Sequence, residues 1–435
     1  MDCAKLKADI EKLKESKNLI DTQLAEFLQT DLSKPKPIKE TLQKASEDKD
    51  EILQEYLQEF VDKNPEILES TYSVGEIIEG FYSTITATVP LSDGEILVCG
   101  QAGEMRILCK DNDGYKYGEK IAAPDNDIEA AYKLSDNQIL INYRHNGPVI
   151  LTIESKDDIR TDLVVGFGKQ INAISKTPNG EILAFGEEGE TRVLKKEGSG
   201  YVFGYKINGF KEDILSTLEI SNDEILACGV GGETRVLRKE NGVYSYSEKI
   251  PGSIQYAEKM LKISDSEIIV FSENGETRLL HNENGEFAYD VDASYFENEI
   301  HNIQKLSDSE ILVYNEYNDE FQRILHKKDG KLIYSDTIKG FKESIYATQA
   351  TPNGETLVFG EKGKIRILYK KDGEYFFTNN IEGFDNDIYC CQQLSDNETL
   401  LCGKNGETRI LHHDPNIDLS NLKKYLQAIA KKKAQ

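Results

Sequence analysis

The sequence predicts an all-β fold, an eight-bladed β-propeller of four-stranded blades, from three observations. A seven-residue pattern, LSDGEIL at Leu91, occurs eight times, and its copies start 43 residues apart except for one interval of 45. Four short β patterns with Gly, Asn and Asp turns between them fill each interval. The last interval lacks its fourth β pattern, and a matching pattern precedes the first copy. A fixed period of this size indicates units that bury their faces by stacking on one another.

The third copy shows the elements of one unit most clearly. Residues 170–176 form a first short strand, and TPNG at 177–180 forms a turn. Residues 181–185 form a second strand, 190–195 a third, and 201–207 a fourth. Strands inside such a blade lie against neighbouring blades on both faces, so continuous apolar stretches such as EILAF are expected.

The ends of the repeat region predict how the ring closes. The eighth copy stops after its third strand, at Leu411, whereas TYSVGEIIEGF at 71–81 matches the fourth strand and loop of other copies. Phe81 precedes Ile85 by four residues, as Phe384 precedes Ile388. The N-terminal strand is therefore predicted to complete the last blade, so that residues 71–415 form a closed ring without an open sheet edge.

The flanking segments carry helical periodicity. Residues 1–70 contain a heptad-like stripe and, after SKPKP at 33–37, a second amphipathic pattern, which predicts a helical hairpin or coiled-coil-like segment. Residues 416–435 predict a short C-terminal helix. One interpretation of the N-terminal helices is a cap or spacer; the other is an element for homodimerisation or for docking a partner.

The composition limits the classes of partner. The chain has 435 residues and a net charge of −25, which argues against nucleic acid and anionic membranes as partners. It has no apolar stretch long enough to span a membrane and no apolar signal core at its N-terminus, so a cytoplasmic location is expected. Cys99, Cys228 and Cys402 share one repeat position with phenylalanines of other copies, which predicts reduced cysteines packed in the core.

The unit resembles the WD40 repeat. TPNGEILAFGEEGETRVL at 177–194 aligns with that family's pattern of a Ser-Pro-Asp-Gly-type turn, a hydrophobic strand, a Gly-containing turn and Thr-Val-Arg-Leu-Trp-Asp. The resemblance covers about residues 71–414. Here the repeats lack the Trp-Asp ending, which Leu194-Lys195 replaces in this copy, and they lack a recurrent Gly-His dipeptide. The resemblance implies a propeller of WD40 type.

The most conspicuous repeated motif is G-E-x-R-[IV]-L in the third strand. A ring of arginines could receive a phosphate or carboxylate. Each arginine has acidic residues nearby in the repeat, however, so a structural role within an ion-pair and hydrogen-bond lattice is the favoured interpretation. The arginines are Arg106, Arg192, Arg235, Arg278, Arg323, Arg366 and Arg409.

The positions that vary within the constant repeat are the better candidates for function. The residue after the conserved Ile at the start of each innermost strand is expected at one mouth of the central channel, a place where propellers bind partners. Aromatic side chains there suit recognition of a protein surface. The candidate partner-binding residues are Glu129, Asn172, His301, Tyr346 and Tyr389. At the other end of these strands, Lys133, Lys176, Lys262 and Lys305 form either a basic collar for an acidic segment or a solvated rim.

These patterns predict a non-catalytic protein-protein interaction scaffold that binds a peptide or protein. The histidines lie at positions too far apart around a ring to share a metal ion, and no catalytic motif is recognisable, so no metal, cofactor or enzymatic activity is expected. The alternative is a propeller that binds a sugar or small molecule, with a pocket in each blade. Recurring aromatics near the fourth strand would favour that class: Tyr201, Tyr244, Phe287 and Tyr375. A propeller enzyme is a third and weaker alternative.

Overall fold

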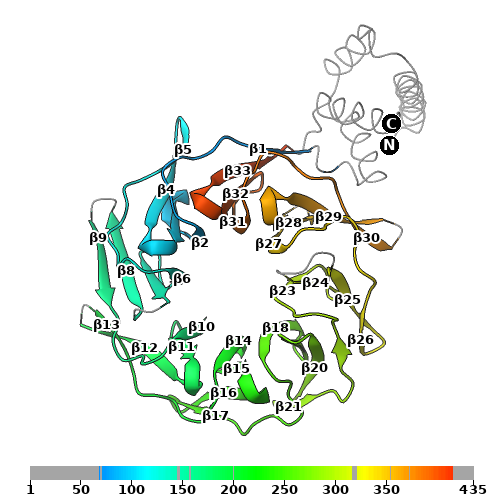
Figure 1. The fold of residues 1–435 in the computed structure, drawn as a ribbon. Coiled ribbons are helices and arrows are strands. Elements are labelled where there is room, and N and C mark those ends of the chain that lie inside the picture. Colours follow the sequence, from blue (N-terminus) through cyan, green and yellow to red (C-terminus); the bar gives the residue numbers. More distant parts are fainter. Residues whose placement is uncertain are drawn as a thin grey trace, which may run out of the picture.

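The fold is a closed ring of blades. The computed structural model describes Leu68 and residues 71–414, except residues 145–146, 156–157, 199, 316–320, 353 and 372. In this part of the chain eight antiparallel sheets surround a central opening, and each sheet is a four-stranded blade, with one extra short strand in the fifth (Figure 1). The predicted eight-bladed propeller is confirmed. The predicted helices in 1–70 and 416–435 lie outside the described residues.

The blades follow one another along the chain, and each runs from an innermost to an outermost strand. Blades 1 and 2 contain β2 (Ile85–Pro90), β3 (Ile96–Gly100), β4 (Met105–Asp111), β5 (Gly114–Tyr117), and β6 (Ile128–Lys133), β7 (Gln138–Tyr143), β8 (Val149–Ser155), β9 (Asp158–Leu163). Blades 3 and 4 contain β10 (Ile171–Lys176), β11 (Ile182–Gly186), β12 (Thr191–Glu197), β13 (Gly200–Phe203), and β14 (Ile214–Ser221), β15 (Glu224–Gly229), β16 (Thr234–Glu240), β17 (Val243–Tyr246).

Blades 5 to 8 repeat this order. Blades 5 and 6 contain β18 (Ala257–Ser264), β19 (Glu267–Ser272), β20 (Glu276–Glu283), β21 (Glu286–Tyr289), β22 (Ser294–Tyr295), and β23 (Asn302–Lys305), β24 (Glu310–Tyr314), β25 (Arg323–Lys328), β26 (Lys331–Tyr334). Blades 7 and 8 contain β27 (Ile345–Ala350), β28 (Thr356–Gly360), β29 (Ile365–Lys371), β30 (Glu374–Phe377), and β31 (Ile388–Ser395), β32 (Glu398–Gly403), β33 (Thr408–His413), β1 (Tyr72–Val74).

The N-terminal strand closes the ring as predicted. β1 pairs antiparallel with β33, in a register that places Tyr72 opposite His413 and Val74 opposite Leu411. The Gly75 amide continues the pairing by donating to the Ile410 carbonyl at 2.8 Å. Strands from the two ends of the described chain therefore share blade 8, and no blade presents an incomplete sheet.

Within one blade the predicted strands differ from the observed ones mainly at the outer edge. β10 and β11 each begin one residue later than predicted, and β12 extends to Glu197. β13 ends at Phe203, four residues before the predicted end. The segment after it keeps only isolated backbone hydrogen bonds to β12, from Gly204 N to Val193 O and from Ile207 N to Thr191 O, because the chain is turning toward the next blade.

The hydrophobic core lies between the blades. Eight clusters of buried side chains fill the eight interfaces between adjacent blades. The cluster between blades 8 and 1 contains Phe81, Ile85, Val98 and Cys402. Burying a side chain of this size contributes roughly 1.5–3 kcal/mol, so the closing interface is held by packing as well as by strand pairing. The three cysteines of the shared repeat position, Cys99, Cys228 and Cys402, are fully buried, as predicted.

Two connections in each blade lie at the same end of the ring. The second hairpin joins the second and third strands, and the inter-blade loop joins an outer strand to the next inner strand. In blade 8 the second hairpin contains a short 3-10 turn, η7 (Lys404–Gly406), whose first amide donates to the Asp387 carbonyl just before β31 at 3.0 Å. Equivalent turns are η3 (Gln101–Gly103), η4 (Glu187–Gly189), η5 (Val230–Gly232) and η6 (Glu361–Gly363).

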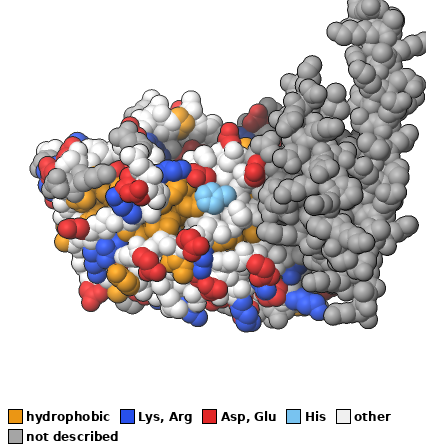
Figure 2. Space-filling view, turned by 90° about the horizontal axis from the view of Figure 1, so that it is seen from above, with side chains coloured by type: hydrophobic (Ala, Val, Ile, Leu, Met, Phe, Trp, Pro, Cys, Tyr) orange, Lys and Arg blue, Asp and Glu red, His pale blue; other side chains and the backbone are white. Residues whose placement is uncertain are grey.

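One side of the outer wall of the ring carries side chains of both charges. Figure 2, turned by 90° from the view of Figure 1, shows acidic and basic side chains interspersed, with an apolar area beside a histidine. Charges of both signs in close proximity do not create a broad single-sign field on this wall. Within the described part of the chain, no helix combines the length and apolar character required to cross a membrane.

Candidate functional site

The start of each inner strand defines the mouth of the central opening at the end where the second hairpins lie. A buried residue, Ile in seven blades and Ala257 in blade 5, is followed by the variable residue of the repeat. In seven blades the strand pairing shifts register at this variable residue, which marks a β-bulge. The variable residues are Thr86, Glu129, Asn172, Leu215, Glu258, His301, Tyr346 and Tyr389.

The five predicted partner-binding residues fall into two groups. Glu129 and Asn172 belong to blades 2 and 3, whereas His301, Tyr346 and Tyr389 belong to blades 6, 7 and 8, across the opening (Figure 1). The sequence order of the blades already implied this separation. A ligand that contacts both groups must therefore span the mouth.

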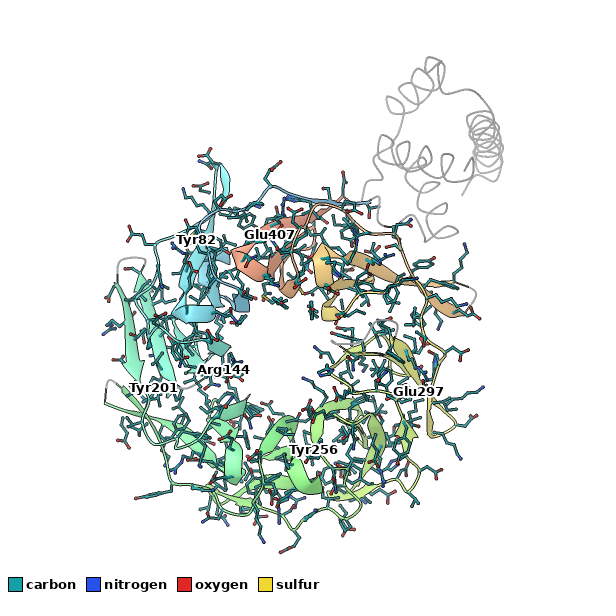
Figure 3. All side chains as sticks on the ribbon, viewed as in Figure 1. Tyr82, Arg144, Tyr201, Tyr256, Glu297 and Glu407 are labelled. Carbon is teal, nitrogen blue, oxygen red and sulfur yellow. The ribbon has the colours of Figure 1, made fainter. Side chains whose placement is uncertain are left out.

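The first group is largely engaged by the scaffold. Glu129 accepts hydrogen bonds from Arg144 Nε at 3.2 Å and Gln170 Nε2 at 2.7 Å. Figure 3 shows Arg144 on the inner side of its blade, beside the opening. The Asn172 side-chain amide donates to the Ile214 carbonyl of the next blade at 3.0 Å. Asn172 thus connects blades 3 and 4, a use that its position in the repeat did not reveal.

The second group contains an aromatic pair. The ring centroids of Tyr346 and Tyr389 lie 5.0 Å apart with the ring planes tilted by 51°, within the range for interacting aromatic side chains. The Tyr389 hydroxyl donates to Asp387 Oδ2 at 3.3 Å. Burial, the negative charge of Asp387 and the neighbouring Tyr346 raise the pKa of Tyr389 to about 12, so its ring is neutral at physiological pH.

Acidic residues continue this part of the mouth into blades 5 and 6. His301 Nε2 lies 3.8 Å from Glu299 Oε2. Burial raises the pKa of Glu258, and the negative charge of Glu273 acts in the same direction. Sequence reasoning had not connected Glu273 or Glu299 with the mouth. Glu273 lies in a second hairpin, and Glu299 lies two residues before the variable position.

The repeated arginines bond mainly within their own blades. Arg192 Nε donates to Glu190 Oε1 at 2.6 Å and Nη1 to the Gly204 carbonyl at 2.7 Å, and Arg235 repeats both bonds with Glu233 and Ser247. Arg106, Arg278 and Arg409 pair with glutamates in the same way. Arg323 instead pairs with Glu297 at 2.7 Å, and Arg366 bonds to the Thr378 carbonyl and lies over the Phe341 ring. We propose on this basis that the seven arginines are structural.

The glutamate of the same motif holds the inter-blade loop. Glu407 accepts hydrogen bonds from the amides of Asp385 and Asn386 and from Arg409 Nε at 2.7 Å. Glu104 binds the amides of Tyr82 and Ser83, and Glu233 those of Lys211 and Glu212. Every residue except proline has a backbone amide, so a sequence pattern does not indicate which amides these glutamates bind, and these bonds were not predicted.

These carboxylates predict that stability decreases in acid. Burial pushes the pKa of Glu104, Glu233 and Glu407 upward, but hydrogen bonds from arginine and from the loop amides outweigh it, so each pKa lies below its ordinary value of 4.5. Since the pKa is lower in the folded state than in the unfolded state, this stabilisation is complete above about pH 4.5 and is lost as the pH falls through the folded-state pKa. Urea unfolding between pH 7 and pH 3 measures the effect, and a flat stability profile would contradict it.

The opposite end of the inner strands is locally neutralised. Lys133, Lys262 and Lys305 each lie within 3.4 Å of an aspartate three residues later, in the adjoining turn. Lys176 Nζ donates to the Leu134 carbonyl of the preceding blade at 2.8 Å. This arrangement favours the solvated-rim interpretation over a receptor for an acidic segment.

The recurring outer tyrosines connect adjacent blades. The hydroxyls of Tyr115, Tyr244 and Tyr375 donate to Glu398, Glu181 and Glu310 of the preceding blades at 2.8–3.0 Å. Tyr201, at the outer circumference in Figure 3, bonds to Gln138 in the same way. Their repetition is therefore accounted for by contacts between blades. No group of three or more His, Cys, Asp or Glu side chains that could hold a metal occurs among the described residues.

The ring of four-stranded blades, closed by an N-terminal strand, defines an eight-bladed β-propeller, and solved WD40 domains share this architecture. The C-terminal WD40 domain of Sif2 has a TM-score of 0.57 and 13% identity, with 79% of this chain and 99% of that chain covered. Saccharomyces cerevisiae Sqt1 has a TM-score of 0.59 and 9% identity, with 79% and 99% covered. Chaetomium thermophilum Sqt1 bound to the N-terminus of ribosomal protein L10 has a TM-score of 0.56 and 9% identity, with 78% and 98% covered.

Low identity limits these similarities to the fold. No family model matches the chain, and no curated protein matches its sequence. The predicted resemblance to WD40 propellers is confirmed for the architecture.

Proposed function

We propose that this protein is a non-catalytic scaffold that binds a peptide or protein segment at the mouth. The observation that carries the proposal is the partly buried pair of Tyr346 and Tyr389, at variable positions of an otherwise repeated framework. Aromatic side chains contribute strongly at recognition surfaces because they bury a large area with few rotatable bonds. Sqt1, a propeller of similar architecture, was solved with the N-terminus of ribosomal protein L10 bound, which supports this class of partner.

The test is a selection of random twelve-residue peptides on the full chain. Selected peptides are measured again on the triple variant His301→Ala, Tyr346→Ala and Tyr389→Ala, for which we expect affinity to fall at least about tenfold. The matched control is Tyr205→Ala, Tyr295→Ala and His412→Ala, which removes the same residue types from exposed positions away from the inner strands. Unchanged affinity in the mouth variant would show that the surface is wrongly assigned.

For residues 1–70 we propose homodimerisation or docking of a second partner. The heptad-like stripe supports an interface with another helix. Light scattering on the full chain and on a chain that starts at Thr71 tests the first alternative. The shorter chain retains β1, so a monomer there beside a dimer of the full chain would assign dimerisation to the removed segment.

A further inference from the structure

The aromatic pair at the mouth resembles an arrangement that occurs at three outer hairpins, where a lysine lies over the tyrosine of the paired strand and a glutamate of the preceding blade bonds to the tyrosine. Lys110 Nζ lies 4.8 Å from the centre of the Tyr115 ring, and Glu398 accepts hydrogen bonds from both side chains. In the same way Lys239 lies over Tyr244 beside Glu181, and Lys370 over Tyr375 beside Glu310, both at 5.1 Å. In each case the lysine lies directly opposite the tyrosine across the outer hairpin. These pairs show that a tyrosine face beside a carboxylate accommodates an ammonium group.

The mouth contains both parts of that arrangement, an aromatic face and a carboxylate. The Tyr389 hydroxyl bonds to Asp387, and the Tyr346 ring adds a second aromatic face 5.0 Å away. Glu361, in the second hairpin of blade 7, lies near Tyr389 and pairs with Lys362 at 2.7 Å. Lys404 Nζ lies 3.7 Å from Asp387 Oδ2, so a cation already approaches this carboxylate from the second hairpin of blade 8.

The charge around the mouth extends this preference beyond the pair. Three positions in each blade lie at this end of the opening: the variable residue, the residue two before it, and the first residue of the second hairpin. Among those that the structure describes, the bases are Arg144 and Lys404, and the acids are Asp127, Glu129, Glu187, Asp213, Glu258, Glu273, Glu299, Glu361 and Asp387. Burial and the charge of Glu273 raise the pKa of Glu258, and the nearby Lys259 and His301 act in the opposite direction.

Acids therefore outnumber bases at these three positions of the mouth, and some of the acids are ion-paired there, with Arg144, Lys362 and Lys404. At the far end, lysines pair with aspartates of the adjoining turns. An acidic rim attracts basic ligands and accelerates their association, an effect that salt weakens.

We propose that the tyrosine pair receives an arginine or lysine side chain from a basic segment of the partner. This inference rests on the proposed function and specifies the partner's chemistry. A guanidinium group stacks on aromatic faces and also bonds to carboxylates, so arginine fits Tyr346, Tyr389 and Asp387 better than lysine does. The acidic residues of blades 5 and 6 receive the remaining basic residues of the segment.

The experiment uses the full chain and two fluorescein-labelled probes, the peptides GRGRGRGRG and GEGEGEGEG, in an anisotropy titration. We expect binding of the arginine peptide alone, weakened by raising the salt from 50 to 300 mM. Changing both tyrosines to leucine removes the π faces while retaining apolar volume, and should weaken binding about tenfold. Changing both to phenylalanine retains the faces and should weaken binding by less than about threefold. The control is Tyr205→Leu with Tyr295→Leu.

Equal binding of the two peptides, or equal affinity of the leucine variant and the unchanged protein, would overturn the inference. A second measurement needs no substitution: an arginine peptide that carries a benzophenone should crosslink to peptides containing Tyr346 or Tyr389, and crosslinks confined to other blades would also overturn it. The random-peptide selection separates the two proposals. Selected peptides that depend on the mouth but are not basic would refute the cationic partner and leave the scaffold function standing, whereas no dependence on the mouth would refute both.

Discussion

Replacing Gly406 with alanine is expected to lower the free energy of unfolding by about 3 kcal/mol. Gly406 ends the η7 turn with a φ of +75°, and a Cβ atom there would lie 2.1 Å from the Phe81 carbonyl oxygen and 2.9 Å from the Tyr82 amide nitrogen. The close atoms belong to the backbone of the loop entering blade 1, so relief requires movement of blade 8 against blade 1. The change therefore adds steric overlap to the strain of a left-handed residue.

The matched control for this variant is Gly242→Ala in the hairpin between β16 and β17. Gly242 has a φ of +82°, and its Cβ would meet no atom within 4 Å. The control carries the conformational strain without the overlap and should cost about 1 kcal/mol. Urea unfolding followed by circular dichroism measures both variants. Equal losses would show that the contact between the two blades contributes nothing to the requirement for glycine.

The Glu407→Gln variant is expected to lose about 3 kcal/mol of unfolding free energy. The Glu407 side chain is only 4% exposed and binds Arg409, the Asp385 and Asn386 amides and the Asn386 side chain. Glutamine retains the volume, but it leaves Arg409 with only the exposed Asp385 carboxylate as a counterion and places an NH₂ group beside amide donors. The loop that leads into blade 8 should loosen at the same time, which amide hydrogen exchange at Asp385 and Asn386 can detect.

Glu297→Gln provides the control for that experiment. Glu297 also pairs with a repeated arginine, Arg323, but its side chain is 66% exposed, and such exposed pairs contribute about 0–1 kcal/mol. The Glu407 variant should also lose part of the acid sensitivity predicted above, because the carboxylate that titrates is gone. A Glu407 variant as stable as the Glu297 variant would mean that the buried pair only offsets the cost of its own burial.

Gly406 and Glu407 explain why the G-E pair recurs in the repeats. The second hairpin of blade 8 lies between two inter-blade loops: Glu407 binds the loop leading into its own blade, and Gly406 closely approaches the loop leading into the next blade. The repeat displayed this pair, but not its two partners. Asp385 lies about twenty residues before Glu407 along the chain, whereas Phe81 lies hundreds of residues before Gly406. Only closure of the ring brings Phe81 to Gly406.

Sequence periodicity alone determined the blade, the number of blades and the closing strand. Each is a local pattern repeated at a fixed interval: the turn with its apolar strand, and the displaced pattern around Tyr72 that pairs with β33. Such patterns are visible in a sequence because the alternation of apolar and polar residues and the turn residues each extend over only a few positions. Repeated units generally bury both faces of their sheets by stacking on one another. The same reasoning selected Tyr346 and Tyr389, since variation within a constant repeat is visible without a structure.

The tertiary structure decided how the side chains at the mouth are used. Asn172 and Tyr389 occupy equivalent positions of the repeat, yet the first bonds to a backbone carbonyl of the next blade and the second lies against an aromatic ring and a carboxylate. The Asn172 amide bonds to the next blade, whereas the Tyr389 ring packs on Tyr346 of the preceding blade and its hydroxyl bonds to a carboxylate two residues earlier. The sequence therefore determined the framework, because its interactions repeat. The tertiary structure decided the site, because the contact between the Tyr346 and Tyr389 rings joins side chains that differ from those at the same positions of the other blades.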